Sequence, residues 1–169
     1  AREPLRVIEG IEHRDGVSLG MQETELELAV RRPDEARLVW AKEVWAKAEG
    51  KTRFTRPQIY AREAIELSAY PPTVRLKLQA MRIGELGIAA SPCETFAETG
   101  LAIKQASPLE PTFVIELANG YHGYLPTPEQ HAWGGYETWP ARSSCLEVEA
   151  ERKIRKAVLD LLSEVSKRG

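Results

Sequence analysis

Residues with side chains suited to metal binding or proton transfer gather in two segments near the middle of the chain. Glu94 follows Ser91-Pro92-Cys93, and a loop rich in glycine and proline carries Tyr121, His122 and Tyr124. Carboxylate, phenol and imidazole groups are the usual proton donors and acceptors of enzymes, and carboxylate and imidazole also bind metal ions. The sequence therefore contains a candidate acidic and phenolic site.

The elements that must position these residues are two apolar strands. One is expected over 85–90, just before Glu94, and the other over 112–118, just before the loop with Tyr121 and Tyr124. In open α/β sheets, ligands bind where loops leave the carboxyl ends of strands. We therefore expect the three side chains to meet at one edge of a sheet.

The same residues also have purely structural interpretations. Ser91-Pro92-Cys93-Glu94 matches a capping box with proline at the first helical position, so Glu94 could simply close the start of a helix. The tyrosines of the loop could pack their rings and bond their hydroxyls locally. His122 belongs to no HExxH or similar paired spacing. The residues alone leave a site and a structural role both open.

The rest of the chain alternates strands and helices, which predicts an α/β fold with a mixed β-sheet and helices packed on it. Leu86–Ala90 is uniformly small and apolar, so we expect it to be covered on both faces. The expected strands are 5–11, 24–30, 74–82, 85–90 and 112–118, and the expected helices are 34–49, 57–68, one beginning at Ser91, and 147–167.

Length and composition are those of one globular domain spanning 1–169. The 169 residues are 43% hydrophobic and carry a net charge of −2, without a linker or an internal repeat. No basic face interleaved with aromatic residues is present, which argues against nucleic acid as a partner. Cys93 and Cys145 match no zinc-binding spacing.

A family resemblance appears in the same segments. The stretches 82–104, 112–129 and 134–137 resemble the neutral/alkaline non-lysosomal ceramidase family, above all its shorter bacterial members. Pro92-Cys93-Glu94 is similar to the family's Pro-Gly-Glu stretch, and Asn119-Gly120-Tyr121-His122-Gly123-Tyr124 to its Asn-x-Tyr-x-x-Tyr loop. The resemblance covers most of the chain past residue 22 and maps onto the second half of the family's catalytic domain.

The resemblance implies a zinc-dependent amidohydrolase in which a metal-bound water attacks the amide of an N-acylated (sphingo)lipid. Glu94 and Tyr124 are then the zinc ligands carried by this chain, and Tyr121 and His122 are its candidate catalytic residues. Contact with a membrane would be peripheral at most. A secreted or periplasmic location would follow from the family, although the sequence itself indicates no compartment.

Two departures from the family pattern shape this interpretation. Cys93 replaces the glycine of the Pro-Gly-Glu stretch, and neither the strands with the two histidine ligands nor the segment with the proposed catalytic serine is among these 169 residues. A carboxylate and a phenol alone would hold zinc weakly. We therefore expect one half of a larger two-half catalytic domain, completed by an N-terminal half or a partner chain.

Three functional hypotheses remain at this stage. The first is the zinc hydrolase half-site. The second is a non-catalytic α/β module that keeps the fold without the metal, and the third is a related zinc hydrolase that acts on a different amide or ester, because a fold does not fix a substrate.

Overall fold

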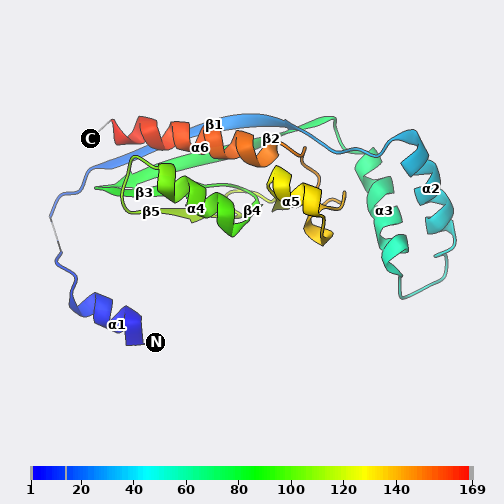
Figure 1. Ribbon diagram of the computed structural model, residues 1–169, viewed down its shortest axis with the longest axis horizontal. Coiled ribbons are helices and arrows are strands. Elements are labelled where there is room, and N and C mark those ends of the chain that lie inside the picture. The colour runs from blue at the N-terminus through cyan, green and yellow to red at the C-terminus, as the bar shows by residue number, and fades with distance from the viewer. Residues whose placement is uncertain (1, 14, 168–169) are drawn as a thin grey trace.

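The computed structural model describes residues 2–13 and 15–167 and contains a mixed sheet with helices packed on it (Figure 1). The strands are β1 (Leu19–Ala29), β2 (Thr73–Ile83), β3 (Leu86–Ala90), β4 (Glu94–Thr95), β5 (Thr112–Ile115) and β6 (Tyr124–Leu125). The helices are α1 (Arg2–Glu9), α2 (Glu35–Ala46), α3 (Arg56–Ser68), α4 (Ala97–Ala106), α5 (Pro128–Trp133) and α6 (Ala150–Ser166), with a 3₁₀ turn η1 (Tyr136–Thr138).

The main sheet has the strand order β1-β2-β3-β5. β2 pairs antiparallel with both β1 and β3, whereas β5 pairs parallel with β3. Gly84 opens the two-residue turn between β2 and β3 with φ at +60°, a conformation that glycine adopts without strain. The mixed sheet predicted from the four strand-like segments is confirmed.

The main core lies between this sheet and α6. The alternation of β1 and β2 turns Leu28, Leu76 and Leu78 toward α6, which runs along both strands (Figure 1). α4 packs against β5 and α6 and adds Ile103 to the same core. The buried stripe of α6 is the one that its helical periodicity predicts: Ile154, Val158, Leu161, Leu162 and Val165.

β3 is buried, as expected. Its outward face is covered by side chains of the neighbouring strands instead of by a second layer of helices. Ile88 is 7% exposed, and its neighbours in the sheet register are Met81 on β2 and Phe113 on β5. Further along, this outward face becomes charged, where Lys77 pairs with Glu23 at 2.9 Å. Side chains of the flanking strands thus cover the outward face of β3.

The predictions for 5–11 and for the end of the strand at 112–118 are wrong. The segment expected as a strand at 5–11 is the exposed helix α1, which Glu3 and Arg6 stabilise through an ion pair one turn apart. The strand expected over 112–118 ends at Ile115, because Leu117 and Asn119 turn the chain with φ of 52° and 60°. A short apolar run does not distinguish helix from strand, and local turns of this kind leave no periodicity.

α2 and α3 form a helical hairpin that projects from the end of the sheet (Figure 1). They pack on each other through a small core of Ala41, Ala61 and Ala64, and both were predicted as helices. Asp34 caps α2 by accepting the N–H of Arg37 at 2.7 Å. Among the helices of residues 2–13 and 15–167, none combines the length and apolar character needed to cross a membrane.

The packing of α6 predicts the effect of truncating Leu161, which is 5% exposed. Leu161→Ala is expected to lower the free energy of unfolding by about 2–5 kcal/mol, because it opens a cavity under the helix. Leu101→Ala on α4, where the side chain is 64% exposed, serves as the control and should change stability by less than about 0.5 kcal/mol. Guanidinium titrations of both variants measure the difference, and equal stabilities would contradict the packing.

Candidate functional site

The two proposed metal ligands lie side by side. β4 and β6 form a small parallel ladder in which Glu94 is the register partner of Tyr124 and Thr95 that of Leu125. Adjacent strands lie about 4.8 Å apart, and residues in register project to the same face. The structure therefore brings together the carboxylate and the phenol that the sequence places in separate loops.

Backbone hydrogen bonds hold the loop with Tyr121 against the segment before Glu94. Three consecutive carbonyls, those of residues 91–93, accept N–H groups from the loop: Ala118 bonds to Ser91 at 2.9 Å, His122 to Pro92 at 2.9 Å and Leu117 to Cys93 at 3.2 Å. The N–H of Glu94 then donates to the carbonyl of Gly123 at 2.9 Å. Four consecutive residues, 91–94, thus each bond to the loop, which holds the loop against the chain at the start of β4.

The capping-box interpretation of Glu94 is wrong. The N–H of Ser91 donates to the carbonyl of Ile115 at 3.0 Å, and α4 begins only at Ala97. The ladder between β3 and β5 thus uses the N–H that a capping glutamate would accept, and Glu94 lies in a strand. Its carboxylate is not needed to start a helix.

Three tyrosines lie near Glu94, and one of them bonds to its carboxylate. Burial raises the pKa of Tyr121, and the neighbouring Glu94 adds to this rise through its charge and a hydrogen bond. The ring of Tyr124 packs edge-on against that of Tyr136, with centroids 5.7 Å apart and an interplanar angle of 83°. A hydrogen bond with Tyr124 raises the pKa of Tyr136. Tyr136 thus joins the site, although sequence reasoning gave it no role beyond the Gly134-Gly135-Tyr136 stretch of the resemblance.

Tyr121 and His122 line a cavity of about 600 Å³ that α3 also lines, through Tyr60 and Glu63. Burial lowers the pKa of His122, so its imidazole is neutral at neutral pH and can accept a proton. The two candidate catalytic residues therefore face a space large enough for an organic molecule.

The donor set fits part of a zinc site. Zinc usually takes four ligands, drawn from cysteine sulfur, histidine nitrogen, carboxylate oxygen and water. Within the described ranges, no group of three or more His, Cys, Asp and Glu residues is placed to hold a metal ion. Burial raises the pKa of Cys93 to about 12, so this thiol stays protonated and is a poor ligand. Glu94 and Tyr124 together can supply two oxygen ligands, and nitrogen donors would have to come from another polypeptide segment.

The segment after η1 forms the support of β6. The N–H of Tyr124 donates to the carbonyl of Ser143 at 2.8 Å, and the neighbouring Arg142 is held by Glu63 of α3 at 2.8 and 2.9 Å. Gly123 has φ at +75°, and a β-carbon there would lie 2.2 Å from the Ser143 carbonyl oxygen. Only glycine allows this close approach.

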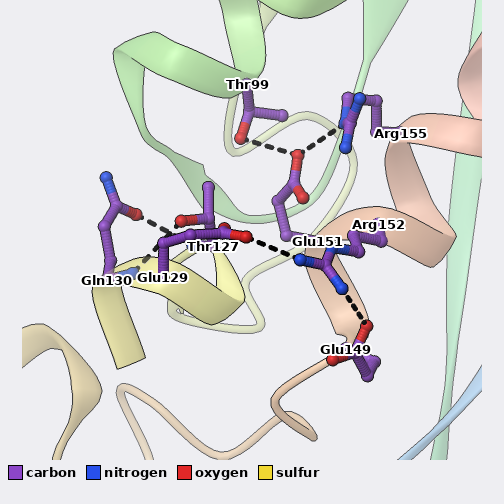
Figure 2. Close-up of polar contacts among 8 residues, drawn as sticks. All are labelled: Thr99, Thr127, Glu129, Gln130, Glu149, Glu151, Arg152 and Arg155. Atoms are coloured by element: carbon purple, nitrogen blue, oxygen red, sulfur yellow. Dashed lines mark hydrogen bonds and ion pairs between the residues drawn. The ribbon is translucent and has the colours of Figure 1, made fainter. Parts of the chain in front are cut away.

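A network of polar side chains fixes the elements that follow β6 (Figure 2). Glu151 at the start of α6 is 2% exposed and accepts hydrogen bonds from Thr99 of α4 and Arg155, both at 2.9 Å. Arg152 reaches Glu129 of α5 at 2.6 Å. Because α5 begins three residues after Leu125, these bonds also anchor the end of the Tyr124 strand.

Comparison with solved structures shows the fold of part of a ceramidase. The neutral ceramidase of Pseudomonas aeruginosa superposes on 89% of this chain with a TM-score of 0.56 and 18% identity. A structure described as a ceramidase complexed with C2 superposes on 73% of the chain with a TM-score of 0.51 and 20% identity. This chain spans only 29% and 21%, respectively, of those two proteins. No protein-family sequence model and no curated protein sequence matches it.

The close approach at Gly123 predicts a large effect of a single methyl group. Gly123→Ala is expected to lower the free energy of unfolding by about 2–6 kcal/mol, through backbone strain and the clash with Ser143. Gly50→Ala is the matched control, because Gly50 has φ at +73° and nothing within 4 Å of the added carbon. It should cost only about 1–2 kcal/mol. Thermal and denaturant unfolding compare the two, and equal costs would rule out the close approach.

The Glu63–Arg142 pair predicts a pH dependence of stability. Hydrogen bonds from Arg142 hold the pKa of Glu63 below its ordinary value of 4.5, so the pair stabilises the fold above this pH and loses its contribution as the pH falls. Glu63→Gln should therefore be less stable at neutral pH and lose less stability between roughly pH 5 and 3 than the unmodified chain. Parallel stability curves for the two proteins would contradict the pairing.

Proposed function

We propose that this chain is part of a zinc-dependent amidohydrolase resembling neutral ceramidase. The observation that carries the proposal is the pairing of Glu94 with Tyr124 in the β4–β6 ladder. The ceramidase fold supports it, because the chain superposes on 29% of the neutral ceramidase of Pseudomonas aeruginosa.

In this proposal the chain is the C-terminal half of a two-half catalytic domain. Glu94 and Tyr124, paired in the ladder, would supply two oxygen ligands to zinc, and two histidines from an N-terminal half or a partner chain would complete the ligand set. When bound, zinc lowers the pKa of a water molecule and polarises the carbonyl group of the substrate. The substrate is an N-acylated (sphingo)lipid that is cleaved to a fatty acid and an amine.

The chain's other side chains have distinct roles in the proposed reaction. Tyr136 orients the phenol of Tyr124 by hydrogen bonding, and Tyr121 orients the carboxylate of Glu94 in the same way. The Tyr121 hydroxyl can also donate a hydrogen bond to the substrate oxygen on which negative charge develops. His122, neutral and at the wall of the cavity, can accept and return a proton.

The zinc proposal predicts the outcome of Glu94→Gln in the polypeptide produced from the full reading frame that contains this chain. The variant should lose zinc, measured by metal analysis after dialysis, and its hydrolysis of a fluorescent N-acylsphingosine should fall at least about 100-fold. Glu98→Gln removes the same charge from an exposed position of α4 and should change neither property. The unfolding free energy of Glu94→Gln should stay close to that of the parent, because its backbone makes the ladder bonds.

Other outcomes separate the remaining hypotheses. A full-length protein that binds no zinc and cleaves no amide would establish the non-catalytic module. Zinc binding through Glu94 combined with hydrolysis of other amides or esters would keep the metal site and refute the lipid substrate. Zinc and activity that survive Glu94→Gln would move the site elsewhere.

A further inference from the structure

A second cavity, of about 690 Å³, lies between the α2–α3 hairpin and the segment that follows η1. Its walls combine four guanidinium groups with two indole rings. These residues are Arg31, Arg32, Arg37 and Arg56 with Trp40 and Trp139. They come from three separate parts of the chain, so the cavity exists only in the folded protein.

Positive charge exceeds negative charge in this cavity. Asp34 is the single acidic residue among the lining residues, beside four arginines, and its carboxylate also caps α2. In the part of the chain that the structure describes, no ion pair includes any of the four arginines. An unpaired group of like charges lowers stability unless a ligand of opposite charge uses it.

Arg31 is partly buried, so water screens its charge less than the charge of an exposed arginine. Its guanidinium donates to the carbonyls of Leu146 at 2.7 Å, Thr138 at 2.8 Å and Ser144 at 2.7 Å. These acceptors fix the group in place but are neutral. Burial lowers the pKa of Arg31, which reflects the cost of removing its charge from water.

The aromatic rings hold the two outer guanidinium groups in place. The Cζ atom of Arg37 lies 3.8 Å from the ring centroid of Trp40. The Cζ atom of Arg56 lies 5.3 Å from the ring centroid of Trp139. A stacked guanidinium keeps its N–H edges available for a carboxylate, sulfate or phosphate. Tyr60 packs edge-on against Trp139 at 5.1 Å and extends the apolar surface.

We propose that this cavity binds a single acidic amphiphile, with the anionic group between Arg37 and Arg56 and the apolar body along Trp40 and Trp139. Its volume is within the range of small-molecule sites. The cavity adjoins the candidate active site, since Tyr60 lines both, but the inference does not depend on zinc or on hydrolysis.

Binding of four small probes to the unmodified chain tests the charge and the apolar body separately. Octanoate carries both features, octan-1-ol only the apolar body, acetate only the anion, and octyltrimethylammonium the opposite charge. Titration calorimetry at low salt should show saturable binding of octanoate, and at least about tenfold weaker binding of the other three. Tryptophan fluorescence should change with octanoate, because Trp40 and Trp139 line the site.

A pair of double variants locates the binding. Arg37→Gln with Arg56→Gln should weaken octanoate binding at least about tenfold. Arg75→Gln with Lys77→Gln removes the same charge from the exposed side of β2 and should leave binding unchanged. Equal binding of octanoate by both double variants, equal affinity for octan-1-ol, or equal affinity for acetate would each overturn the proposal. Thermal unfolding verifies that both variants are folded.

Discussion

The candidate site depends on one backbone contact, the passage of Gly123 against Ser143. Because residue 123 has no side chain, its carbonyl can accept the N–H of Glu94 while Tyr124 donates to the Ser143 carbonyl on the other side. β6 is only two residues long, and its Leu125 is buried in the main core at 1% exposure. Its position therefore comes from these bonds, from the burial of Leu125, and from the supports behind them, the Glu63–Arg142 pair and the polar network at the start of α6.

The main sheet and the closing helix were predictable because their signals are periodic. β1 and β2 alternate polar and apolar residues, and α6 carries one apolar stripe, so each pattern admits a single structure. α1 was mistaken for a strand, because its few apolar residues fit either period. The helix expected at Ser91 begins at Ala97, because pairing with β5 overrides a local capping signal. Tertiary hydrogen bonding of this kind is not visible in a short segment.

The candidate site, like the fold, was only partly predictable from the sequence. The position of Glu94 and Tyr124 after two predicted strands placed them at one edge of the sheet, and the family resemblance alone assigned them as metal ligands. Their adjacency follows from a parallel ladder between two-residue strands, which has no detectable sequence pattern. The arginine-lined cavity had no sequence signal at all, because its lining residues lie in three segments, at 31–40, 56–67 and 139–140. The four arginines come from the first two of these segments, and they line one cavity with the third segment only in the folded chain.

α3 forms a shared wall of the two cavities. Its Tyr60 lines both, while Glu63 holds the centre of the helix to the segment that supports Tyr124. A ligand in one cavity that displaces the Tyr60 ring changes the affinity of the other cavity for its own ligand, and by reciprocity the second ligand changes the affinity for the first by the same factor. The Tyr60 ring is thus the point at which binding events in the two cavities would be coupled.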